Sequence, residues 1–194
     1  MTATAPSVSP ASAWLQRYYF LRAGVSIAWI ALAVVVGRQN AAVGAVLLVL
    51  YPAWDALANY IDARRTGGLG ANGTQMFNFI VSVVTAVAIG VALTSGMVAT
   101  IKVFGVWAIL SGLLQLATAV RRWKSAGGQW VMILSGAQSA AAGAFFFKQA
   151  SSGMPLDITT VAPYAGLGAF YFLLSAVWLT VRSARQRRAA AAGR

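Results

Sequence analysis

The sequence contains no cysteine, no histidine and no glutamate. Without cysteine there can be no disulfide, no thiolate metal site and no cysteine nucleophile, and without histidine the commonest general base is missing. Asp55, Asp62 and Asp157 are the only acidic side chains that could serve acid–base chemistry or metal binding. We therefore expect a protein with no catalytic residues, no cofactor and no metal site, and not an enzyme.

Charge of either sign is also scarce. Charged residues make up 9% of the chain and hydrophobic residues 59%, whereas about a quarter of an ordinary soluble domain is charged. On a soluble domain the net charge of +12 would suggest a nucleic-acid partner. Here the basic residues stand in short tracts between apolar runs, which indicates a membrane protein and no nucleic-acid partner.

Six apolar stretches of about 20 residues each fill most of the chain, and at a rise of ~1.5 Å per residue each can cross a hydrocarbon core of ~30 Å. They cover residues 18–37, 41–61, 76–94, 97–120, 130–150 and 161–181. The sequence thus predicts an all-α membrane protein with six transmembrane helices in a domain over residues 17–182. A Ser-, Ala- and Pro-rich disordered tail (1–16) is expected to precede this domain, and a basic tail (183–194) to follow it.

The basic residues predict the orientation of these helices. Of the 15 Lys and Arg residues, all except Arg38, Lys102 and Lys148 flank the segment ends that share one side. By the positive-inside rule, both termini and the two longer connections lie in the cytoplasm. The lipid bilayer is the expected partner, with anionic lipid headgroups at the basic cytoplasmic ends.

Small residues recur at regular spacing and support an arrangement of three repeated hairpins. The second, fourth and sixth stretches follow one another at intervals of about 60 residues, and each ends in an Arg-containing sequence. Gly105 with Gly112, and Gly136 with Gly143, are seven residues apart, so each pair lies on one helix face that another backbone can approach closely. Such faces serve packing within the chain, and they would equally suit a homo-oligomer or a glycine-lined pore.

Two neighbouring stretches carry a family resemblance. GVWAILSGLLQLATAVRRWK at residues 105–124 and QWVMILSGAQSAAAGAFFF at 129–147 combine a central Gly112, a Gln115 near the helix end, a basic turn and a Trp130 that opens the next helix. This pattern resembles the HdeD-like membrane protein family, which is built from a short repeat of unknown function and includes a bacterial acid-resistance protein. The resemblance implies a six-helix inner-membrane protein, linked to acid or stress tolerance, and brings no catalytic residues.

Asp55 is the polar residue of greatest interest, because it lies roughly 9 Å inside the cytoplasmic end of its predicted helix. A carboxylate at full bilayer depth costs ~2.5 to 3.5 kcal/mol or more, so it needs a partner, and Arg22 of the first helix is expected at similar depth. The predicted intramembrane polar cluster consists of Asp55, Arg22, Asn59, Asn78, Gln115 and Gln138. Helix packing is its simpler interpretation, and a proton- or ion-responsive site is the functional one.

Two classes of function therefore stay open at this point. A non-enzymatic membrane protein of the HdeD-like type is the leading hypothesis. A small channel or transporter with a polar site around Asp55 is the alternative, which internal repeats favour in principle. The scarcity of polar residues in the outer half of the helices weakens this alternative.

Overall fold

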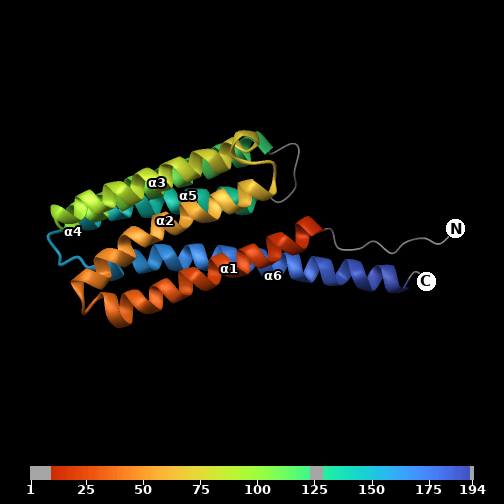
Figure 1. Cartoon of the computed structure of the whole chain (residues 1–194), viewed down its shortest axis with the longest axis horizontal. Helices are drawn as coiled ribbons and strands as arrows, with labels where there is room; N and C mark the ends of the chain where they lie inside the picture. The colour runs from red at the N-terminus through yellow and green to blue at the C-terminus, as the bar shows by residue number, and fades with distance from the viewer. Residues whose placement is uncertain (1–9, 123–128, 193–194) are drawn as a thin grey trace. The chain divides into compact units, whose positions relative to one another are not determined.

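The computed structural model describes residues 10–122 and 129–192, and these residues form helices and connecting turns without a β-strand. Figure 1 shows the long helices, coloured in chain order. They are α1 (Pro10–Leu32), α2 (Ala41–Arg65), α3 (Gly73–Thr94), α4 (Met97–Arg122), α5 (Gln129–Ala150) and α6 (Ala162–Ala192). Shorter turns are the π-helical η1 (Ala33–Gly37), which continues α1, and the 3₁₀ turns η2 (Leu69–Ala71) and η3 (Ile158–Val161).

Each long helix carries a segment that is long and apolar enough to cross a membrane. The six segments overlap the six apolar stretches of the sequence. For the part of the chain that the structure describes, this confirms the prediction of an all-helical protein with six helices long and apolar enough to span a membrane. Their exposed faces carry large aliphatic residues such as Val84, Val87 and Val91 of α3, as expected of helix surfaces that face lipid. The chain is a multi-pass membrane protein.

Two helices, α1 and α6, extend furthest beyond the apolar stretches that predicted them. α1 begins at Pro10, so residues 10–16 of the expected disordered tail are helical, and residues 1–9 lie outside the described residues. Proline is well suited to a first helical turn, which explains this start. α6 continues to Ala192 because the Arg, Gln and Ala residues that follow its apolar part are strong helix formers.

The connections use residues suited to sharp turns. α3 and α4 are joined through Ser95 and Gly96 alone, and Gly96 adopts a φ of 99°, a left-handed conformation that favours glycine. At the start of α2 the side chain of Asn40 accepts hydrogen bonds from the backbone N–H groups of Ala42 and Val43. Such an N-cap satisfies two N–H groups that would otherwise lack partners.

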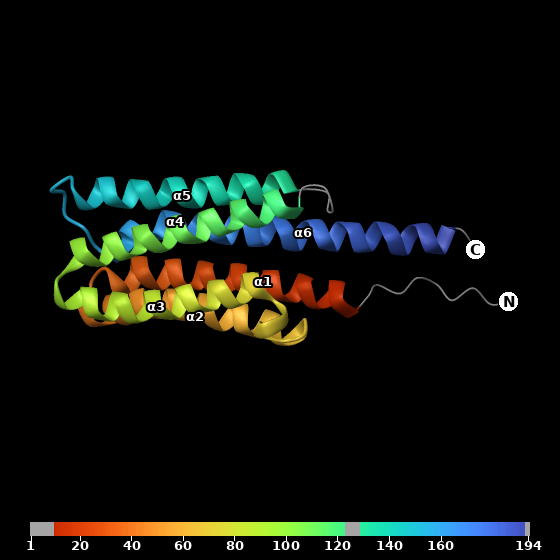
Figure 2. The same ribbon diagram turned by 90° about the horizontal axis from the view of Figure 1, so that it is seen from above.

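By their contacts the residues divide into two units, one made of residues 1–28 and 165–194 and the other of residues 29–164. In the larger unit α2 packs along α3, α3 along α4, and α4 along α5. Figure 2 shows these neighbouring helices from a second direction. Each pair is antiparallel, because consecutive helices are joined by short connections.

Glycines bring α4 and α5 into close contact. A Cβ atom added at Gly112 would lie 2.5 Å from the carbonyl oxygen of Gly136, and one added at Gly143 would lie 2.5 Å from the carbonyl oxygen of Gly105. The two glycine pairs that are seven residues apart in the sequence therefore face each other across this interface. This confirms that they form close-packing faces, and here the packing is within the chain.

The turns at one end of the larger unit are joined by an ion pair. Arg38 Nε lies 3.4 Å from Asp157 Oδ2, and both side chains are well exposed, so the pair adds at most about 1 kcal/mol. Asp157 also accepts a hydrogen bond of 2.8 Å from the backbone N–H of Thr159 and thereby caps η3. Behind it, Ile158 is buried against Gly37.

In the smaller unit the first part of α1 lies antiparallel to the last part of α6 (Figure 1). Gln16 Nε2 donates to the carbonyl oxygen of Leu179 at 2.9 Å and to Ser183 Oγ at 2.8 Å. Further along, the rings of Tyr19 and Phe172 stack with centroids 6.2 Å apart. The N-terminal end of α1 and the C-terminal end of α6 therefore lie at the same end of this unit.

The substitution Gly112→Ala should destabilise the protein by about 1–3 kcal/mol, because the new methyl group would overlap backbone atoms of α5 and force the two helices apart. Thermal unfolding in detergent, followed by tryptophan fluorescence, would measure the loss. Gly90→Ala in α3 is the matched control, since a Cβ there meets no atom within 4 Å. Equal stability of the two variants would contradict the close contact.

Candidate functional site

Asp55 is the centre of the candidate site. It is half-buried on α2, and its Oδ2 accepts a hydrogen bond of 2.8 Å from Ser82 Oγ of α3 and one of 3.1 Å from Asn59 Nδ2. Asn59 follows Asp55 by one helical turn and also donates to the backbone carbonyl of Asp55 at 2.8 Å. These donors offset part of the cost of holding a carboxylate inside a membrane.

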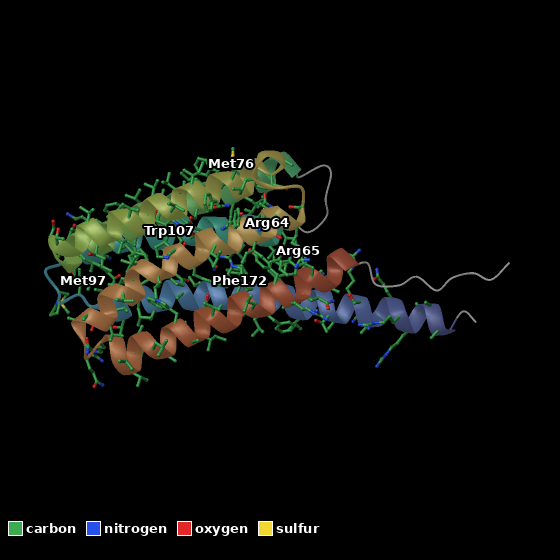
Figure 3. The ribbon with its side chains drawn as sticks, in the orientation of Figure 1. Arg64, Arg65, Met76, Met97, Trp107 and Phe172 are labelled. Atoms are coloured by element: carbon green, nitrogen blue, oxygen red, sulfur yellow. The ribbon has the colours of Figure 1, made fainter. Side chains whose placement is uncertain are left out.

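Ser82 connects this carboxylate to α4. Its hydroxyl donates to Asp55 and accepts a hydrogen bond of 3.1 Å from the indole N–H of Trp107, which is labelled in Figure 3. Ser82 is only 1% exposed and Trp107 only 4%. The resulting chain of hydrogen bonds, called here the Asp55–Ser82–Trp107 chain, joins three consecutive helices in an environment where unmet hydrogen bonds are costly.

Aromatic rings enclose the end of this chain at Trp107. Tyr51, Phe104 and Tyr164 each place a ring centroid 5.8 to 5.9 Å from that of Trp107, in edge-to-face arrangements. Tyr51 in turn contacts Trp29, whose indole N–H donates to the carbonyl oxygen of Leu47 at 2.7 Å. Packed aromatic rings of this kind stabilise a core.

The other predicted members in the same unit have different surroundings. Asn78 donates to the carbonyl of Thr74 in its own helix at 3.2 Å, and Gln115 accepts a long hydrogen bond of 3.5 Å from Ser135 of α5. Gln138 is exposed on α5. The hydrogen bonds of Asn59 reach Asp55, whereas these bonds of Asn78 and Gln115 go to other residues.

Arg22 belongs to the smaller unit. Its Nη1 lies 3.3 Å from the hydroxyl oxygen of Tyr18, to which it donates, and its guanidinium carbon lies 4.2 Å from the ring centroid of Phe172. A cation over an aromatic face is worth about 0.5–2 kcal/mol, the larger value applying away from water. The predicted ion pair of Arg22 with Asp55 stays a prediction.

Sequence reasoning missed Ser82 and Trp107, the two residues that extend the site beyond α2. A usable signal was present for each. Ser82 follows Asn78 by one helical turn and so shares its face, and a tryptophan in the middle of an apolar helix needs an acceptor for its N–H group when buried.

The six spanning helices and this internal polar chain define a multi-pass membrane protein, and one comparison adds a family similarity. A family described as a short repeat of unknown function (DUF308) matches residues 78–148. This range covers most of α3, all of α4 and most of α5, a little over a third of the chain. The chain is thus similar to a membrane-associated repeat family over these helices.

Comparison with curated proteins found no match. Comparison with solved structures found none either.

The substitution Ser82→Ala should lower stability by about 1–3 kcal/mol, because it takes a donor from Asp55 and leaves the Trp107 N–H without its acceptor. The measurement is thermal unfolding in detergent. Ser111→Ala in α4 is the control, since the structure records no hydrogen bond from that hydroxyl. In a double-mutant cycle with Trp107→Phe the two losses should not add, and full additivity would show that the two side chains do not interact.

Proposed function

We propose that this chain is a non-enzymatic integral membrane protein of the HdeD-like type that contributes to acid or stress tolerance. It resides in the plasma (inner) membrane with both termini in the cytoplasm and acts through its packed helices and its partners. The proposal extends the similarity over residues 78–148 to the whole chain and to a physiological role.

The observation that carries this proposal is the coincidence of three features in α3, α4 and α5. The matched repeat lies there, the glycine pairs bring α4 and α5 together there, and the hydrogen bond between Ser82 and Trp107 joins α3 to α4 there. The same stretch carries the motif of residues 105–147 on which the resemblance rests. A repeat whose distinctive residues serve helix packing supports a function that depends on the fold.

The surroundings of Ser82 support a non-enzymatic role. A serine hydroxyl that donates to a carboxylate resembles a catalytic nucleophile with its general base. The distance of 2.8 Å between Ser82 Oγ and Asp55 Oδ2 would allow such a pair. Ser82 is 1% exposed, however, and its oxygen already accepts from the Trp107 N–H. A substrate atom could not approach this oxygen without displacing packed side chains.

The alternative is a small channel or transporter with a polar site around Asp55. It is favoured by the position of the carboxylate, since ionisable groups within a membrane often mark the path of an ion or proton. The aromatic rings around Trp107 weaken this alternative. Tyr51, Phe104 and Trp107 are at most 9% exposed and fill the space next to the Asp55–Ser82–Trp107 chain.

The proposed partners follow from the same membrane location and orientation. They are the lipid bilayer, anionic lipid headgroups at the basic cytoplasmic ends and, as a further assembly, a second copy of the chain. The glycine faces of α4 and α5 are occupied by each other, so a homo-oligomer would have to use a different surface.

Proton flux in proteoliposomes would separate the two functions. For the packing role we expect the wild-type protein to release a pH gradient no faster than protein-free vesicles, and Asp55→Asn to behave the same way. A wild-type flux well above the vesicle background that Asp55→Asn abolishes would overturn the proposal in favour of a transporter.

Survival of an acid challenge would test the physiological part. Cells that lack the protein should survive less well than cells with the wild-type chain, and Gly112→Ala should restore less protection than Gly90→Ala because the role depends on helix packing. Membrane levels of each variant, measured by immunoblot, would separate lost folding from lost function. Equal survival with and without the protein would contradict the proposed role.

A further inference from the structure

The charges of the smaller unit are all of one sign. Residues 1–28 and 165–194 contain no acidic residue, since Asp55, Asp62 and Asp157 all belong to the other unit. The unit has arginines on both of its helices, Arg17 and Arg22 on α1 and Arg182, Arg185, Arg187 and Arg188 on α6. This unit therefore contains no acidic side chain that could pair with these arginines.

A structural contact brings the arginines of the two helices to the same place. Gln16 donates to the carbonyl of Leu179 and to Ser183 Oγ, which fixes this turn of α1 against this turn of α6. Arg17 directly follows Gln16, and Arg182 directly precedes Ser183. Both arginines are exposed, so two guanidinium groups border a contact that is itself anchored by side-chain hydrogen bonds.

The continuation of α6 extends this basic surface along the helix axis. Arg182 directly follows the last residue of the apolar stretch, and α6 stays helical to Ala192. From Arg182 to Arg188 the helix advances six residues and rises about 9 Å. This is close to the ~5–8 Å that the headgroup region of one leaflet occupies beyond the hydrocarbon core. Trp178, one turn before Arg182, is 69% exposed, as is usual for an aromatic residue at the membrane interface.

We propose that Arg17, Arg182 and Arg185, at the joined ends of α1 and α6, bind the phosphate headgroup of an anionic phospholipid. Guanidinium groups pair with phosphate in a bidentate manner, and the helix ends hold these side chains at the level of lipid phosphates. Arg187 is not assigned to this site, because its Nε already donates to the backbone carbonyl of Ser183 at 3.4 Å. The site specifies the anionic-lipid partner of the proposed function and rests on its cytoplasmic orientation.

Quenching by brominated lipid would test this site in the full-length protein. The protein is reconstituted in phosphatidylcholine vesicles, and brominated phosphatidylglycerol or brominated phosphatidylcholine is added in small fractions. Tryptophan fluorescence, to which Trp178 contributes beside the site, should be quenched at a lower fraction of phosphatidylglycerol. The double variant Arg182→Gln/Arg185→Gln should need at least about tenfold more phosphatidylglycerol, and high salt should reduce the wild-type preference.

The matched control is Arg64→Gln/Arg65→Gln, which removes the same charge from the end of α2 (Figure 3) and should change the preference less than twofold. An equal loss in both double variants, or no preference in the wild type, would overturn the site. Loss of the preference on adding inorganic phosphate would also overturn it, by assigning the arginines to a soluble anion. A reporter fused after Arg194 tests the orientation separately, so a failed topology is distinguishable from a failed lipid site.

Discussion

Hydrocarbon offers no hydrogen-bond partners, and this constraint governs the structure. The helices satisfy their own backbones, so only polar side chains need further partners. Ser82 meets two such needs at once, as a donor to Asp55 and an acceptor for Trp107. Ser139 has a similar position on α5, where it donates to the carbonyl of Ala108 and lies 3.0 Å from the Tyr164 hydroxyl. Buried polar groups thus become connections between helices.

The same constraint explains how much of the fold could be predicted. The number and approximate position of the spanning helices follow from segment length and hydropathy, which depend only on bilayer thickness. The contact of Gly105 and Gly112 with α5 was also predictable as a close-packing face, because small residues two turns apart expose backbone along one line. The helix ends outside the apolar stretches could not be predicted in this way. Pro10 and Ala192 lie where hydropathy carries no information, so local helix propensity determines where the helix begins or ends.

The candidate site could be predicted only in part, for a different reason. Asp55 is conspicuous because a carboxylate in an apolar helix is rare, and Asn59 follows from the spacing within that helix. Ser82 and Trp107 lie on other helices, and their meeting with Asp55 depends on how each helix is rotated about its axis. Many rotations of a helix about its axis bury a similar apolar area, so hydropathy does not determine which one is adopted. The hydrogen bonds do determine it, since a wrong rotation would leave the indole N–H of Trp107 and the carboxylate of Asp55 without partners.

α4 shows how the two kinds of contact depend on each other. Gly105 and Gly112 face α5, whereas Trp107, two residues after Gly105, lies about 200° further round the helix and reaches α3. α4 therefore presents backbone to one neighbour and a hydrogen-bonding ring to the other. Its rotation is fixed from both sides, because a turn that improved one contact would break the second. The glycines and the Asp55–Ser82–Trp107 chain thus specify one arrangement of α2 to α5, which neither would specify alone.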